Sequence, residues 1–451
     1  MIKSVNTRAV VLDILLEVNE NDGYSHITVN NALKKYQYLD KKERAFISRL
    51  SQGTIERQIT IDYVIDEFSQ VAVKRMKPVI RNILRMSVYQ IMYMDTVPDS
   101  AAVDEAVKLA NRRGFFNLSS FVNGVLRNVV RSHDLVSFPD REKNILRHLS
   151  IKYSMPEWII RKWLSEFDEE TVEKMLRSFL TVDDTTIRCN TNRISVEELK
   201  KSLEEENVVA TEAPYLPFAL KISGYNYLDT VKSFKDGLFQ IQDISSMLVG
   251  LVAHPKKDSY VIDVCAAPGG KSLHVSELLG ATGYVEARDL TESKVNLIKE
   301  NIERMQAVNV GARVMDALAL DELSIEKADI VIADLPCSGL GVIGKKKDIK
   351  YKMTKEKQEE LEKLQRDILS QVQNYVKPGG FLIYSTCTVN SGENIENVRW
   401  FMKNFKFELE GFSELLPKEL VCKTTDKGYL QLIPGVHKCD GFFIAKLKRI
   451  G

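Results

Sequence analysis

The chain has 451 residues, of which 44% are apolar and 28% charged, so it is typical of a folded protein with more than one domain. Its 63 Lys and Arg residues against 62 Asp and Glu residues give a net charge of +1, which excludes a global basic field for nucleic-acid binding. No stretch approaches the roughly 20 uncharged apolar residues of a membrane span, and the N-terminus has no signal-peptide pattern. We therefore expect a cytoplasmic protein, without membrane contact and monomeric.

Residues 1–132 show apolar residues at helical spacing throughout. Val10, Ile14 and Val18 lie on one such stripe, in "RAVVLDILLEV". Arg112 and Arg113 lie near a predicted helix end, where they are candidate phosphate contacts; a solvated basic face is the alternative. This pattern predicts an all-α bundle.

A shorter mixed region follows the helices. Residues 133–165 are predicted as a linker and connecting helix, since "HDLVSFPDREKN" breaks the helical run. Residues 166–235 are predicted as a small α+β module, with a strand in "TTIRCNTNR" and a helix that begins at the capping box of Ser195 and Glu198. Such a module suits RNA recognition, although composition alone does not show it.

From residue 236 to 451 short apolar strands alternate with amphipathic helices, which predicts a parallel, doubly wound α/β sheet. The ending "YLQLIPGVHKCDGFFIAKLK" contains two strands around a Pro-Gly turn, so an antiparallel edge is expected. The whole chain is thus predicted to be multidomain: a helical bundle, a small α+β module and a Rossmann-like α/β domain.

The first strand of the α/β region is followed by a small-residue turn and a helix, in "VIDVCAAPGGKSLHV". The turn fits neither the P-loop nor the G-x-G-x-x-G pattern, so phosphate and nicotinamide sites are poorly supported. Asp289 ends the second strand and suits the two hydroxyls of a ribose, whereas Asp316 ends the third and can reach an adenine. A nucleoside cofactor without phosphate, S-adenosylmethionine, fits this set; helix N-caps are the alternative for each aspartate.

Two cysteines follow the next two strands. Cys337 lies in "ADLPCSGLG" after Asp334, and Cys387 lies in "LIYSTCT". A lone buried cysteine usually behaves as a small apolar residue, but two on turns at one sheet edge, beside an aspartate, are harder to dismiss. Methylation of a pyrimidine at carbon 5 needs a thiolate that adds at carbon 6 and later leaves, and cysteine suits both steps.

Four motifs carry a family resemblance: "DVCAAPGGKS", "DLPCSGLG", "YSTCTVNSGENI" and "HKCDGFFIAKL". In this order they resemble the RNA cytosine-5 methyltransferases of the NOL1/NOP2/Sun group. The N-terminal helices resemble the RNA-binding bundle of the NusB antitermination factor. The three parts together are similar to the bacterial members that modify one cytosine of 16S ribosomal RNA, so the resemblance covers nearly the whole chain.

The resemblance implies roles for particular residues. Cys387 matches the nucleophile, Cys337 the cysteine that assists product release, and Asp334 the aspartate that contacts the target base and the cofactor methyl. Asp289 matches the ribose ligand and Asp316 the adenine contact. The cofactor loop is matched by Cys265, Ala266, Ala267, Pro268, Gly269, Gly270 and Lys271. The amine of Lys271 is expected to orient Asp334, and Arg288 departs from the family in standing where an apolar residue is usual.

The remaining motifs leave alternatives open. The basic run of Lys345, Lys346, Lys347 and Lys350 follows the Cys337 turn, so RNA backbone contact is favoured over a solvated face. A DNA cytosine-5 methyltransferase would use Cys337 as its nucleophile, and a non-enzymatic RNA-binding factor would explain only the first third of the chain. No cysteine pair has C-x-x-C spacing, so no metal is expected. Because the sequence shows no secretory signal, the six cysteines are expected to be reduced thiols.

Overall fold

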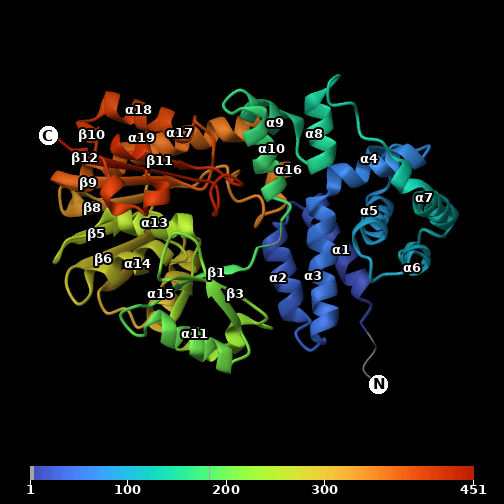
Figure 1. Ribbon diagram of the computed structural model, residues 1–451, viewed down its shortest axis with the longest axis horizontal. Helices are drawn as coiled ribbons and strands as arrows, with labels where there is room; N and C mark the ends of the chain where they lie inside the picture. Colours follow the sequence, from blue (N-terminus) through green and yellow to red (C-terminus); the bar gives the residue numbers. More distant parts are fainter. Residues whose placement is uncertain (1–4, 182) are drawn as a thin grey trace. The chain divides into compact units, whose positions relative to one another are not determined.

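The computed structural model describes residues 5–181 and 183–451 (Figure 1). The chain forms two compact units. The helical unit comprises Met1–Thr181 and Ile343–Lys352, and the sheet unit comprises Val182–Val342 and Met353–Gly451. Among the described residues no helix combines the length and the apolar character that crossing a bilayer requires.

The helical unit confirms the all-α prediction. Its longer helices are α1 (Thr7–Glu20), α2 (Ser25–Lys35), α3 (Lys41–Glu56), α4 (Gln58–Phe68), α5 (Pro78–Tyr93), α6 (Asp99–Arg112), α7 (Ser119–Ser132), α8 (Ile145–Tyr153), α9 (Glu157–Leu164) and α10 (Glu169–Ser178). Local sequence sets several starts: Asn6 caps α1 by accepting from the Ala9 amide, and Pro78 opens α5. The apolar faces of α1, α3 and α5 meet in one core.

Helices α8, α9 and α10 lie beyond the predicted bundle boundary at residue 132, yet they fold with the helical unit. Helix α8 packs against α4, and α9 and α10 pack on α8. Their buried apolar residues include Leu149, Ile160 and Leu176. Helix α8 thus joins the helical unit through α4, and α9 and α10 join it through α8, although the polar stretch around Pro139 separates all three from α7 in sequence.

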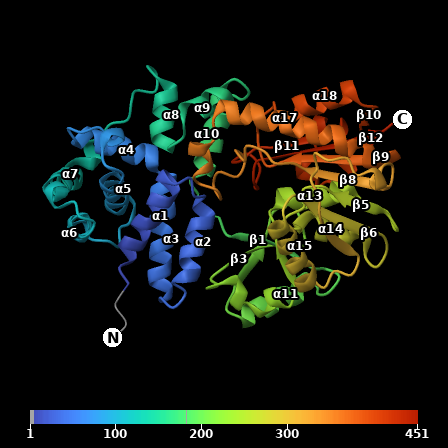
Figure 2. The same cartoon turned by 180° about the vertical axis from the view of Figure 1, so that it is seen from behind.

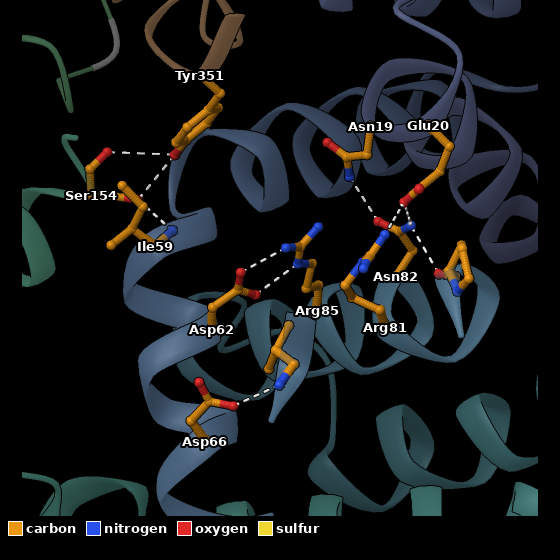
Figure 3. A network of polar contacts seen from close by, with 12 residues as sticks. Asn19, Glu20, Ile59, Asp62, Asp66, Arg81, Asn82, Arg85, Ser154 and Tyr351 are labelled. Carbon is orange, nitrogen blue, oxygen red and sulfur yellow. Dashed lines mark hydrogen bonds and ion pairs between the residues drawn. The ribbon is translucent and has the colours of Figure 1, made fainter. Parts of the chain in front are cut away.

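A buried polar network links helices of this unit (Figure 3). Arg85 on α5 donates two hydrogen bonds to the Asp62 carboxylate on α4, at 2.7 and 2.6 Å. Paired, bidentate bonding compensates the desolvation of both charges. Tyr351, from the distant 343–352 segment, lies 3.1 Å from the Ser154 hydroxyl and donates to the Glu56 carbonyl at 3.1 Å. This segment includes the short helix α16 (Ile349–Lys352) and belongs to the helical unit through such contacts.

The sheet unit begins with a small antiparallel sheet in the order β2-β3-β1-β4. Its strands are β1 (Thr185–Cys189), β2 (Val209–Glu212), β3 (Ala219–Ser223) and β4 (Phe239–Ile241). Helix α11 (Val196–Glu205) starts at the predicted capping box of Ser195 and Glu198. Strand β4 lies past the predicted module end at residue 235, because Ile241 pairs with Ile187 of β1 and completes the sheet.

The large sheet has eight strands in the order β10-β12-β9-β8-β5-β6-β7, with β11 paired to β12. They are β5 (Tyr260–Asp263), β6 (Tyr284–Asp289), β7 (Val310–Val314), β8 (Ala328–Asp334), β9 (Val376–Thr386), β10 (Phe407–Leu409), β11 (Tyr429–Leu432) and β12 (Phe442–Arg449). Strands β5 to β9 are parallel, and β12 pairs antiparallel with β9, β10 and β11, as the sequence predicted.

Helices cover both faces of the large sheet (Figures 1 and 2). Helices α13 (Ile244–Ala253), α14 (Gly270–Leu279) and α15 (Glu292–Met305) pack on one face, and α17 (Lys355–Val372) and α18 (Ile395–Asn404) pack on the other. Alternate residues of β8 divide between the two cores: Ile330 and Ile332 face the first, Val331 and Ala333 the second. This packing fixes the strands whose carboxyl ends carry the site.

Candidate active site

The carboxyl ends of four adjacent strands bring the candidate residues to one edge of the sheet. Asp334 ends β8 in register with Ser385 of β9, Asp263 ends β5 in register with Ile332 of β8, and Asp289 ends β6. Ligands of doubly wound sheets bind at this edge. The two cysteine turns follow directly, after β8 and β9.

The two thiols of these turns lie side by side. The sulfurs of Cys337 and Cys387 are 3.2 Å apart, and both side chains are half-buried. The Gly341 amide donates to the Cys387 carbonyl at 3.1 Å, which joins the two turns through the backbone. The hydrogen bond to Cys387, together with burial, raises the pKa of the Cys337 thiol well above its usual range, so Cys337 is a protonated thiol at neutral pH.

Asp334 is held from two sides. The Lys271 ammonium donates to one carboxylate oxygen at 2.6 Å, and the Ser385 hydroxyl donates to the other at 2.7 Å. Burial acts to lower the pKa of Lys271, but the carboxylates of Asp334 and Asp263 outweigh it and raise the pKa, so the amine stays charged. Cys387 in its thiolate form also raises the pKa of Lys271, so an ammonium faces this sulfur.

The loop from Cys265 to Lys271 forms a tight turn between β5 and α14. The Ala266 amide donates to the Arg288 carbonyl, and Gly269, at φ +102°, occupies a conformation that favours glycine before α14 begins at Gly270. Cys265 is half-buried, and burial raises the pKa of its thiol, which suits a structural cysteine more than a nucleophile. Pro268 is exposed at the tip of the turn.

Asp263, a residue that the sequence analysis did not single out, ends β5 just before this loop. It is fully buried, and burial raises its pKa to about 7 although the Ser272 hydroxyl donates to it at 2.6 Å. The sequence could have revealed Asp263, because a carboxylate inside the apolar run "VIDV" is unusual for a buried strand.

Asp289 is buried at the next strand end and accepts from the Ala267 amide at 3.0 Å. Lys294 forms an ion pair with its other oxygen, also at 3.0 Å. Asp316 is exposed two residues after β7 and accepts from the Leu318 amide at 2.9 Å. Two carboxylates along one edge suit hydroxyl and amine donors and repel phosphates, so the residues fit a nucleoside cofactor without phosphate groups.

Arg288, the departure from the family pattern, points into a separate polar network. Its side chain is 1% exposed. It donates to Glu286 at 2.8 Å and to Ser324 at 2.6 Å, and forms an ion pair with Asp321 at 3.2 Å. Its charge is thus compensated locally, and Asp289 keeps its place at the strand end.

The basic residues proposed for RNA contact divide into two groups within the helical unit. Lys345, Lys346, Arg112 and Arg113 are exposed, with Arg113 also paired to Asp13. Lys347 forms an ion pair with Glu56, and Lys350 is only 1% exposed and donates to the Glu56 carbonyl at 2.8 Å. The prediction that Lys350 contacts RNA is not supported, because its ammonium is committed inside the helical unit.

The sheet order, the small-residue turn after the first strand and the carboxylates at successive strand ends define an S-adenosylmethionine-dependent methyltransferase. Residues 250–448 match the 16S rRNA methyltransferase RsmB/F family, residues 5–131 the NusB family and residues 155–227 the RsmF/B-like ferredoxin-like domain. The chain belongs to the RsmB/F methyltransferase family.

Relatives match over the full length. A "Probable ribosomal RNA small subunit methyltransferase B" of Bacillus subtilis is 35% identical, over 100% of both chains. The crystal structure of PH0851 is 28% identical, with a TM-score of 0.83 and coverage of 99% of both chains. NSun6 from Pyrococcus horikoshii, solved with SFG, is 24% identical with a TM-score of 0.58 over 66% of this chain and 98% of that one, so it supports the fold.

Proposed function

We propose that the chain methylates carbon 5 of a cytosine in 16S ribosomal RNA through a covalent cysteine adduct. The observation that carries the proposal is the pair of sulfurs 3.2 Å apart beside an aspartate held by a lysine. Methyl transfer to oxygen or to an exocyclic nitrogen has no need for two thiols. The ribosomal RNA substrate is supported by the names of the family and of its Bacillus subtilis member.

The two thiols take different roles in this reaction. Cys387 adds as a thiolate to carbon 6 of the base, and the nearby Lys271 ammonium favours that anion. The new electron density at carbon 5 forms the carbon–methyl bond, and S-adenosylmethionine supplies the methyl group when bound. We assign to Asp334, held by Lys271 and Ser385, the role of accepting a hydrogen bond from the exocyclic amine of the base.

Release reverses the addition. A base removes the carbon-5 proton, and the electron pair of that carbon–hydrogen bond restores the carbon 5–carbon 6 double bond. The electron pair of the carbon 6–sulfur bond leaves with the sulfur of Cys387 as a thiolate. Cys337, a protonated thiol 3.2 Å from that sulfur, donates a hydrogen bond to the leaving group. The Lys271 charge near Cys387 supports this assignment of nucleophile and release partner.

Alanine variants of each cysteine test the proposal with cofactor and unmodified 16S ribosomal RNA. Cys387→Ala is expected to abolish both methylation and adduct, whereas Cys337→Ala is expected to accumulate a protein–RNA adduct that survives denaturing electrophoresis. A Cys422→Ala variant, exposed and in another part of the sheet unit, serves as the control. Methylation by Cys387→Ala with loss in Cys337→Ala would reverse the assignment.

The remaining expectations extend this proposal. The helical unit and the small module are proposed to bind RNA, with Lys345, Lys346, Arg112 and Arg113 as phosphate contacts because they are exposed. The protein is proposed to act in the cytoplasm as a monomer. Alanine substitution of Lys345 and Lys346 together tests the contacts: weaker RNA binding with a smaller salt dependence is expected.

A further inference from the structure

The turn between β9 and α18 carries a carboxylate, Glu393, that the reaction as described does not use. Its side chain is 0% exposed. It accepts five hydrogen bonds from neutral groups: the Ser338 amide at 2.7 Å, the Ser338 hydroxyl at 2.6 Å, Asn390 at 3.0 Å, Gln365 at 3.1 Å and Gln358 at 3.2 Å. A carboxylate is the one side chain with acceptor sites for so many donors and no donor of its own.

Burying a carboxylate among neutral partners is costly, so its position calls for a reason. Glu393 binds the residue that follows Cys337 and, through it, is linked to the residue that follows Cys387. Ser338, which it binds twice, follows Cys337; the Ser338 hydroxyl lies 2.9 Å from that of Thr388, which follows Cys387. One buried side chain thereby joins the two thiol turns.

The neighbouring residue, Asn394, completes the clamp on the second turn. Its amide oxygen accepts from the Thr386 hydroxyl at 2.5 Å, and its amide nitrogen donates to the Thr388 carbonyl at 3.0 Å. These two threonines flank Cys387 in the chain. Glu393 and Asn394, in the "GEN" triplet, thus bind the residues that flank the two cysteines.

We infer that Glu393 is a positioning residue that fixes the separation of the two sulfurs, so that Cys337 stays within reach of Cys387 for the release step. The inference rests on the proposed function. The geometric evidence is the pair of hydrogen bonds from Ser338 to Glu393 and the contact between the hydroxyls of Ser338 and Thr388. The Cys387 hydrogen bond and burial are the main causes that raise the pKa of Cys337, and the charge of Glu393 adds a smaller contribution in the same direction.

The charged groups around the pair divide to match the two roles. The Lys271 ammonium faces Cys387 from α14, and Asp334 binds this ammonium from the end of β8. Glu393 acts on Cys337 through Ser338, the next residue in the chain, and its charge also raises the pKa of this thiol by a smaller amount than the Cys387 hydrogen bond and burial do. Loss of its bonds to Ser338 is therefore expected to loosen the turn that carries Cys337.

The test compares full-length wild type with Glu393→Gln in single turnover, with S-adenosylmethionine and unmodified 16S ribosomal RNA. Glutamine keeps one oxygen for the Ser338 amide, and the amides of Asn390 and Gln358 can turn to meet its NH2 group. We expect the adduct to form but persist, with product release slowed roughly tenfold and RNA affinity unchanged. Glu362→Gln is the matched control, since Glu362 also contacts Asn390, at 3.3 Å, but is not the carboxylate that binds Ser338.

Ser338→Ala provides a second test, because it leaves the Glu393 carboxylate and its bond from the Ser338 amide in place but removes the hydroxyl that joins Glu393 to Thr388. It is expected to slow release as well, and it decides the question if Glu393→Gln fails to fold. Release at the wild-type rate by a folded Glu393→Gln, or by Ser338→Ala where that variant decides, overturns the inference. If Cys337→Ala traps no adduct and wild type makes no 5-methylcytosine, the proposed function itself is wrong.

Discussion

Replacement of Lys350 by methionine tests whether the basic run after Cys337 is structural or RNA-binding. Burial, helped by Lys347 and Arg57, lowers the pKa of Lys350 from 10.5 to about 7, although Glu56 opposes this. This lowering of the pKa corresponds to a cost of at most about 5 kcal/mol for keeping Lys350 charged in the folded protein, at about 1.4 kcal/mol for each pH unit. Lys350→Met removes this cost, but it also loses the hydrogen bond to the Glu56 carbonyl, which lowers the gain in stability by about 1–3 kcal/mol.

The sign follows from proton binding. Between about pH 7 and pH 10.5 the unfolded chain holds the Lys350 proton and the folded chain does not, so stability rises with pH over this window. Below it the folded protein carries a buried charge. Lys350→Met is therefore expected to be about 2–4 kcal/mol more stable than wild type near pH 6, and to lose this advantage near pH 10.

Urea unfolding of wild type, Lys350→Met and the exposed control Lys346→Met at several pH values measures this difference. RNA binding by the same three proteins separates the roles: Lys350→Met is expected to bind as wild type does, and Lys346→Met more weakly. A stability difference between wild type and Lys350→Met that does not change with pH would refute the reasoning, as would a loss of RNA affinity in a stable Lys350→Met.

Two further substitutions test other parts of the structure. Asp289→Asn removes the charge at the proposed ribose position, and calorimetry should show S-adenosylmethionine bound at least tenfold more weakly, roughly the loss of one charged hydrogen bond; unchanged affinity would exclude this role. Glu173→Gln removes a carboxylate whose pKa falls to about 2 because it accepts hydrogen bonds from Tyr153, Lys152 and Arg141, which together outweigh the opposing effect of burial. Because the folded pKa is depressed, wild type should be more stable above about pH 4.5, and the difference from Glu173→Gln should vanish as pH falls to about 2; a constant difference would contradict it.

The parallel sheet and its antiparallel edge could be predicted because their signals are local. Each strand is a short apolar run, and the cofactor loop is one continuous motif between a strand and a helix. Parallel order then placed the ends of β8 and β9 at one edge, so the approach of Cys337 to Cys387 followed from topology. The 3.2 Å separation did not, since it depends on the turns themselves.

Long-range contacts explain what the sequence did not reveal. Lys350 has the same local appearance as Lys346, and only the Glu56 carbonyl, 294 positions away, distinguishes a buried lysine from an exposed one. Glu393 lies two residues before α18, where an acidic residue is ordinary, so its bonds to Ser338 gave no local sign. Helices α8 to α10 likewise needed the face of α4 to show which unit they join.

The central claim, that Cys387 is the nucleophile, is tested most directly by locating the bond between protein and RNA. Wild type denatured during turnover, and the Cys337→Ala variant, are digested with protease and nuclease, and the cross-linked peptide is sequenced by mass spectrometry. We predict that a methylated cytidine is attached to the peptide that contains Cys387. Attachment in wild type to Cys337, or an adduct in the Cys387→Ala variant, would contradict it.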